Sequence, residues 1–240
     1  MRNWKDTRLL SLYALVGILT ALFLGCATVP NDQRIDDIPM YGQPEIPRPE
    51  FAQKADEKFI KKAVRLFGSR EEASDAWAEV AEDFFFKGND HYAMRRNNQA
   101  WLLDPENYRP YWGFAQVMMV REKYDDAILY YEKAKELIDD EYQKPALLSD
   151  AGIAHSFKAR SLVDNLEERT RYFDLATQHF QESANLDESY AIVWEAWANS
   201  LYHQEKYAEA WDKVKKARSA GRAVHPKFLE RLGDKFPEPQ

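Results

Sequence analysis

The sequence repeats itself with a period of 34 residues. The segments that begin at Trp77 and Tyr111 align when one is shifted by this distance, and a third copy opens at Trp194. In each copy an alanine follows the opening aromatic residue by 16 positions, as Ala93 and Ala127 do in the first two. A repeat this short cannot bury an apolar face alone, so the chain must stack its units against one another.

Each unit has the pattern of two short helices. Apolar residues recur at helical spacing from Phe51 onward, and glycine is scarce, with 9 in 240 residues. Tight turns are expected at 87–90 and 121–126. Small residues at the repeated alanine positions let the two helices approach closely. Large aromatic side chains are then expected to fill the core, namely Trp77, Phe84, Tyr111, Phe114, Trp194 and Trp197.

The first unit, from Trp77 to Pro105, resembles a tetratricopeptide repeat. It shows the family order of Trp, Leu, Gly or Ala, Tyr, Ala, aromatic, Ala and Pro. Later units keep the alanines but replace the proline with Asp139 and Glu188. The resemblance covers about residues 74–224. It implies an all-α helix-turn-helix solenoid of about four repeats with N- and C-terminal capping helices.

The third unit is irregular. Ala127 and the matching Ala176 are 49 residues apart, 15 more than one period. Leu148 and Gly152 take the places of the opening aromatic and the small residue, so the surplus falls at 160–173. This segment is expected to lengthen both helices into a protruding hairpin, which is either a binding face or a neutral extension. The predicted units are a capping helix at 51–73, repeats at 74–107, 108–141, about 145–190 and 191–224, and a capping helix and tail at 225–240.

The N-terminus has the layout of a secretory signal peptide. A basic stub precedes the uncharged segment 9–25, and the only cysteine of the chain, Cys26, follows Gly25. The sequence "FLGC" resembles the lipobox of bacterial lipoproteins, which implies removal of residues 1–25 and acylation of Cys26. Ala27 after the cysteine is the pattern that favours the outer membrane. The alternative is a signal anchor that is never cleaved; either way the rest of the chain is tethered outside the cytoplasm.

Residues 26–50 are predicted to be the lipidated cysteine and a proline-rich linker. Five prolines and little apolar content between 27 and 50 favour an extended, poorly ordered segment. At about 3 Å per residue it would hold the folded part up to roughly 70 Å from the membrane. A linker without any such role is the alternative.

The sequence offers no candidate for catalysis, a cofactor or a metal. It contains no nucleophile elbow, phosphate loop or dinucleotide fingerprint, and its five histidines are scattered without a His-Glu-x-x-His motif. A single cysteine rules out thiolate metal sites. The net charge of −7 argues against a nucleic-acid partner. We therefore expect a non-enzymatic protein.

Binding is the remaining role. In the tetratricopeptide family the first helix of each unit lines the concave face, where Phe85, Trp112 and Tyr202 would be aromatic anchors. The resemblance implies an envelope scaffold or assembly factor that binds a protein or peptide with apolar residues. The alternative is a small-ligand or glycan module that uses the aromatic rings of this face, namely Phe85, Phe86, Trp112 and Tyr202. The predicted groove residues are Glu82, Phe85, Phe86, Arg109, Trp112, Gln116, Met119, Glu195, Asn199 and Tyr202.

Overall fold

The computed structural model describes residues 34–239, so the signal segment and Cys26 lie outside the described residues. Within this range the chain is helical and contains no strand. None of its helices is long and apolar enough to cross a membrane. The elements are η1 (Ile35–Asp37), η2 (Pro39–Gly42), α2 (Glu50–Phe67), α3 (Arg70–Phe86), α4 (Asp90–Leu103), α5 (Tyr108–Val120), α6 (Tyr124–Leu137), α7 (Lys144–Ser161), α8 (Leu166–Leu186), α9 (Ala191–His203), α10 (Tyr207–Ser219) and α11 (Pro226–Lys235).

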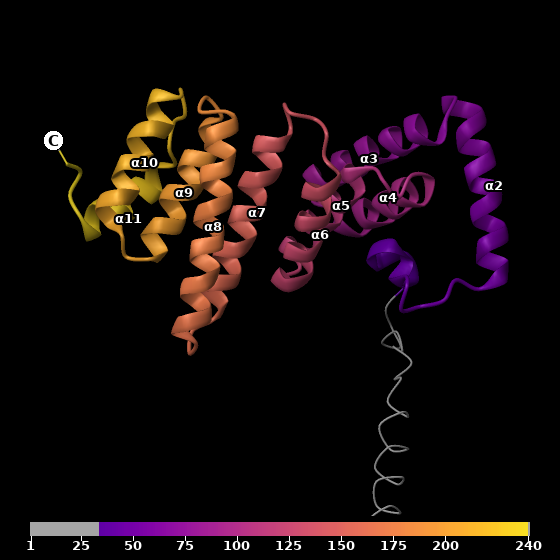
Figure 1. Ribbon diagram of the computed structural model, residues 1–240, viewed down its shortest axis with the longest axis horizontal. Coiled ribbons are helices and arrows are strands. Elements are labelled where there is room, and N and C mark those ends of the chain that lie inside the picture. Colours follow the sequence, from indigo (N-terminus) through magenta and orange to yellow (C-terminus); the bar gives the residue numbers. More distant parts are fainter. Residues whose placement is uncertain (1–33, 240) are drawn as a thin grey trace, which may run out of the picture.

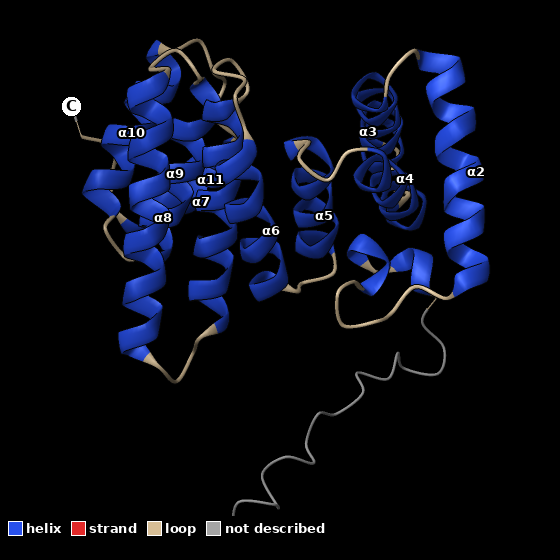
Figure 2. Cartoon of the chain, turned by 45° about the vertical axis from the view of Figure 1, so that its right-hand side comes forward, coloured by secondary structure: helices blue, strands red, loops and turns tan. Residues whose placement is uncertain are grey.

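The helices pack as four successive pairs, α3 with α4, α5 with α6, α7 with α8 and α9 with α10 (Figures 1 and 2). Neighbouring pairs also touch, so the units form one continuous row. The helix α2 precedes the first pair and α11 follows the last. The predicted all-α helix-turn-helix architecture is confirmed.

The turn between the two helices of a pair has the same backbone geometry in three of the repeats. Gly88, Glu122 and Glu205 occupy equivalent positions and have positive φ angles of 74°, 57° and 62°. In each case the amide of the next residue donates to the carbonyl five positions earlier, at 2.9–3.0 Å. In these three repeats the first helix thus ends with a residue in the left-handed conformation and a hydrogen bond back to its last turn, an arrangement common at helix C-termini.

The second and fourth repeats begin with the same kind of hydrogen bond. The Tyr111 hydroxyl donates to the carbonyl of Pro105 at 3.0 Å, and the Trp194 indole N–H donates to that of Glu188 at 2.9 Å. Both bonds reach back six residues. In these two repeats the opening aromatic side chain therefore ties the first helix to the link that precedes it, whether or not that link contains proline.

Small residues lie at the closest helix contacts. The repeated alanines Ala81, Ala93 and Ala100 are at most 1% exposed, and so are their equivalents in later copies. In the third repeat this role falls to Gly152, as its register predicted. A Cβ atom built on Gly152 would lie 2.6 Å from the ring of Phe180, which is fully buried. The α7–α8 pair thus requires a residue without a side chain.

Gly152→Ala is expected to destabilise the protein. An added methyl group must displace the Phe180 ring, and overpacking of this kind costs about 1–3 kcal/mol. The gain in helix propensity is about 1 kcal/mol, so we expect a net loss of up to about 2 kcal/mol in urea unfolding. Gly233→Ala is the control, because its Cβ would meet nothing within 4 Å, and it should stabilise the protein. Equal effects of the two substitutions would contradict the close contact.

The third repeat absorbs its surplus by lengthening both helices. α7 has 18 residues and α8 has 21, against 13 or 14 in the second and fourth repeats. Asn165 caps α8 by accepting a hydrogen bond from the amide of Glu168 at 3.1 Å. Figure 1 shows the α7–α8 loop beyond the ends of α9 and α10.

The expectation of an extended linker is wrong for residues 34–46. They form η1 and η2, which pack against α4. Asn98, fully buried on α4, donates to the carbonyls of Asp36 and Ile38 at 3.1 and 2.8 Å and accepts from the amide of Tyr41 at 3.2 Å. Composition alone predicts an extended segment, because it contains no information about hydrogen bonds to the side-chain amide of Asn98, about 60 residues away in the sequence.

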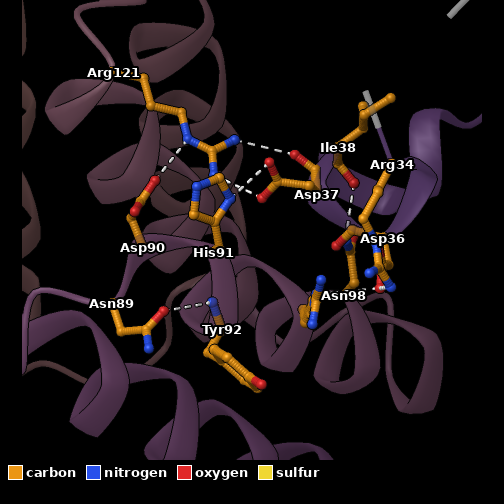
Figure 3. A network of polar contacts seen from close by, with 11 residues as sticks. Arg34, Asp36, Asp37, Ile38, Asn89, Asp90, His91, Tyr92, Asn98 and Arg121 are labelled. Carbon is orange, nitrogen blue, oxygen red and sulfur yellow. Dashed lines mark hydrogen bonds and ion pairs between the residues drawn. The ribbon is translucent and has the colours of Figure 1, made fainter. Parts of the chain in front are cut away.

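An ion-pair network holds the same segment (Figure 3). Arg121 reaches Asp37 at 2.7 Å and Asp90 at 2.9 Å, and its side chain is only 16% exposed. The ring of His91 contacts the other carboxylate oxygen of Asp37 at 2.9 Å. The segment therefore contacts two repeats, through Asn98 and His91 on α4 and through Arg121 after α5.

The two ends of the array are covered by helices. At the N-terminal end Phe59 of α2 packs on Trp77 with ring centroids 5.9 Å apart. Ser69 caps α3 by accepting from the amide of Glu72 at 3.0 Å, which starts the first pair four residues before the predicted boundary at 74. At the C-terminal end Phe228 and Leu232 of α11 are buried against the last pair.

Candidate functional site

The first helices of the pairs, α3, α5, α7 and α9, line two depressions. α3 contacts α5, and α7 contacts α9. The first depression is a cavity of about 60 Å³, far below the 300–1,000 Å³ typical of ligand pockets. Its lining residues are Ala78, Ala81, Glu82, Phe85, Asn97, Arg109, Trp112, Gly113, Gln116 and Gln143.

The charged groups of the first cavity already have partners within the protein. Arg109, 25% exposed, lies 3.6 Å from the carboxylate of Glu82 and 3.9 Å from that of Asp75. Asn107, just before α5, donates to the carboxylate of Asp75 at 2.9 Å and so holds the same group. Arg109 is therefore neutralised between α3 and α5.

Trp112 joins the second repeat to the third. Its indole N–H donates to the carboxylate of Asp150 on α7 at 2.9 Å. Burial raises the pKa of Asp150 to about 6, and the hydrogen bonds from Trp112 and Gln116 oppose this rise. The α5–α7 contact thus contains a carboxylate that titrates between pH 5 and 7.

Asp150→Asn is expected to change how stability depends on pH. The pKa of Asp150 is raised from 3.8 to about 6 on folding, so the native state gains a proton that the unfolded chain does not bind between pH 7 and pH 5. Acidification over this range should stabilise the wild type through this group by about 1 kcal/mol, and that increment should be absent from the variant. Urea unfolding at both pH values measures it. The exposed Asp164→Asn is the control. If the unfolding free energy of Asp150→Asn differs from that of the wild type by the same amount at pH 5 and pH 7, the raised pKa of Asp150 is contradicted.

The second depression lies between α7 and α9. Its volume is about 340 Å³, and it combines apolar side chains with basic ones. Phe157 and Ile192 face it from the two helices and are 37% and 41% exposed. The lining residues are Ile153, Ser156, Phe157, Arg160, Ile192, Glu195, Ala196, Asn199, Ser200, His203 and Arg222.

Internal contacts determine the charge of this second depression. Glu195 forms an ion pair with Arg222 and accepts from the amide of His225 at 3.0 Å. Burial, followed by the nearby arginines, lowers the pKa of His203 to about 4, so that ring is neutral at pH 7. Arg160 has no ion-pair partner among residues 34–239, and its guanidinium lies 4.7 Å from the ring of Phe157. The remaining charge of the depression is positive.

The predicted groove residues fall into three sets. Glu82, Phe85, Arg109, Trp112 and Gln116 line the first cavity, and Glu195 and Asn199 line the second.

The other three predicted residues line neither cavity. Phe86 ends α3 with 74% of its surface exposed, whereas Met119 packs on the core of the second repeat. Tyr202 packs edge-on against Phe228 of α11, with centroids 5.8 Å apart. The four rings of the glycan alternative, Phe85, Phe86, Trp112 and Tyr202, therefore do not form one platform.

The register of the repeats could have located two lining residues, Ile153 and Phe157, that the groove prediction missed. The groove prediction contains no residue of the third repeat, although Leu148 is the predicted opening position of that repeat. Counting from Leu148 as the second repeat counts from Tyr111, the equivalents of Gln116 and Val120 are Ile153 and Phe157. The structure places both in the second depression.

Comparison with known proteins supports the fold. No protein-family model matches the chain, and no curated protein matches it significantly. The solved structure titled "Functional Characterization of Pseudomonas aeruginosa pilF" superposes with a TM-score of 0.52 at 17% identity, over 78% of this chain and 86% of that one. The fold is a tetratricopeptide-like solenoid. Yeast Tom70 matches with a TM-score of only 0.22 at 16% identity, over 87% of this chain and 65% of that one.

Proposed function

We propose that this protein is a lipid-anchored envelope scaffold whose solenoid binds a segment of another protein. The observation that carries the proposal is the depression between α7 and α9. It exposes Phe157 and Ile192 on two neighbouring first helices, and exposed apolar side chains that gather in one depression are typical of binding surfaces. Fold alone does not give function, so the proposal depends on this surface.

The apolar and basic side chains of the depression indicate what kind of partner segment it would bind. The apolar side chains Ile153, Phe157 and Ile192 would receive apolar residues of the partner. Arg160, which has no ion-pair partner in the described part of the chain, provides a positive charge beside them, whereas Arg222 is neutralised by Glu195. We infer a segment that carries apolar residues together with a carboxylate. Such a segment, extended or helical, is what grooves between helices commonly accept.

A non-enzymatic role fits both cavities. The first is too small for a substrate, and its arginine is paired with Glu82 and Asp75. The second contains a neutral His203 but no nucleophile paired with a base. A protein scaffold accounts for open, mixed apolar and basic surface better than a glycan site does, because the aromatic rings are dispersed.

Phe157→Asp is expected to reduce partner binding. A carboxylate in the apolar depression would repel the acidic segment and leave the apolar side chains without contact, which should lower capture roughly tenfold. A photocrosslinking amino acid at position 157, used in intact cells, identifies the partner, and pull-down with the variants measures the loss. Ile192→Asp provides a second variant on the facing helix.

Leu129→Asp is the matched control for this experiment. Leu129 lies on α6, is 63% exposed and lines neither cavity, so the same change in chemistry should leave capture intact. Circular dichroism checks that each variant is folded. Equal capture by the Phe157, Ile192 and Leu129 variants would place binding elsewhere, with the α7–α8 hairpin as the next surface to test.

The anchor, as proposed, would hold the solenoid near the outer membrane on its periplasmic side. Only seven residues lie between Cys26 and Arg34, where the docked segment begins. Fully extended, the eight residue-to-residue steps from Cys26 to Arg34 span about 27 Å. This replaces the roughly 70 Å that a fully extended linker would allow.

Cys26→Ser is expected to release the protein from the membrane fraction. Acyl chains on Cys26 would supply the stable attachment, and the serine variant lacks the thiol that receives the diacylglycerol. Fractionation of cell envelopes, with labelling by a fatty-acid analogue, measures both properties. If the variant stays in the membrane without label, the N-terminal segment is an uncleaved anchor instead. Ser11→Ala, within the apolar segment, is a control that should keep label and membrane.

A further inference from the structure

Two buried histidines and one glutamate converge from three helices. Glu132 lies on α6, His155 on α7 and His179 on α8, and one potential ligand atom from each lies within 4.8 Å of the others. The sequence predicted no metal site, because these residues are spaced about one helix apart. None of the three lines either cavity described above.

We propose that Glu132, His155 and His179 bind a divalent transition-metal ion, with Zn²⁺ as the best match. Two imidazoles and a carboxylate are a donor set that zinc takes when it keeps one further position for water or another ligand. In a tetrahedral site with metal–ligand distances near 2.1 Å, ligand atoms are roughly 3.4 Å apart. The present separations require only small side-chain movements to reach that geometry.

The distances within the cluster fit a cation better than a closed hydrogen-bond network. His179 Nε2 lies 3.0 Å from Glu132 Oε1, but His155 Nε2 lies 3.9 Å from the same oxygen, beyond hydrogen-bond range. The Nδ1 atoms of both rings have no partner among the described residues. His155, only 5% exposed, therefore directs Nε2 at the carboxylate without bonding to it. A metal ion between these atoms would satisfy one nitrogen of each ring.

The cluster is open to an incoming ion at its glutamate. The side chain of Glu132 is 43% exposed, so a hydrated ion can reach its carboxylate from solvent, whereas the side chains of His155 and His179 are only 6% and 7% exposed.

The surrounding charges limit the affinity. Lys135 lies 4.0 Å from Oε2 of Glu132, the oxygen turned away from His179, and 3.5 Å from Glu182 on α8. Its positive charge opposes the ion, whereas Glu182 attracts it. Because neither imidazole donates its Nδ1 hydrogen to a described acceptor, the second-shell support of high-affinity zinc sites is missing. We expect a dissociation constant on the order of micromolar.

Bound metal would join two repeats. Glu132 belongs to the second repeat, and His155 and His179 belong to the third. The two rings are stacked, with centroids 5.0 Å apart and planes at 16°, so α7 and α8 already present them as one unit. An ion would tie this unit to α6 across the repeat boundary.

Zinc titration of the full-length, chelator-treated protein tests the proposal. We expect isothermal titration calorimetry to show one Zn²⁺ per chain and thermal unfolding to shift upward by several degrees, because binding to the native state alone stabilises it. Mg²⁺, which prefers oxygen ligands, should produce neither effect. Substitution with Co²⁺ should give the visible absorption of a four-coordinate site. Absence of Zn²⁺ binding would overturn the proposal.

Variants assign the site. Glu132→Gln keeps the shape of a partly exposed side chain but removes its charge, and His179→Gln removes one imidazole. Each should weaken binding at least tenfold and abolish the Co²⁺ absorption. His225→Gln, an exposed histidine outside the cluster, should leave both unchanged. Since Glu132→Gln should not disturb folding, retained binding by this variant refutes the site, and loss of binding on His225→Gln would place the metal elsewhere.

Discussion

The structure depends on how closely the two helices of each pair approach. Alanines such as Ala93 and Ala127 are fully buried at these contacts, and in the third repeat the glycine at 152 lies directly against the Phe180 ring. That contact fixes the position of α7 against α8. Because α7 also packs on α9, its placement forms the depression lined by Phe157. The same placement turns His155 toward α6 and α8, so one steric constraint positions both candidate sites.

The repeat pattern predicts the features of the fold that depend on local geometry, but not those that depend on contacts between residues far apart in the sequence. Helix pairs, turns and the long third hairpin follow from the 34-residue register, because every copy needs a small residue in the pair and three of the copies close their turn with a left-handed residue. Ile153 could have been found from that register. The packing of Tyr202 against Phe228, which removes Tyr202 from the predicted groove, could not be found in this way, since it depends on how α11 folds back. Nor could the convergence of His155 and His179, which local spacing does not encode.

The docked N-terminal segment shows why composition misleads where single buried polar groups decide. Five prolines suggested a free linker, yet the amide of Asn98 pairs with backbone groups at Asp36, Ile38 and Tyr41. Arg121 adds two largely buried salt bridges, one of them to Asp37. An unpaired amide inside the solenoid would be costly, so the segment completes the fold of the repeats it covers. The consequence is geometric, since it shortens the chain available between solenoid and proposed anchor.

Helix α7 lies between the two candidate sites, and this arrangement has a thermodynamic consequence. Ile153 and Phe157 face α9, while His155 faces α6 and α8. A partner that moves α7 relative to α6 would change the distance between His155 and Glu132, now 3.9 Å. If metal and partner each bind one position of α7 better than another, each must change the affinity for the other by the same factor. Coupling therefore requires no long pathway, because a single helix carries residues of both sites.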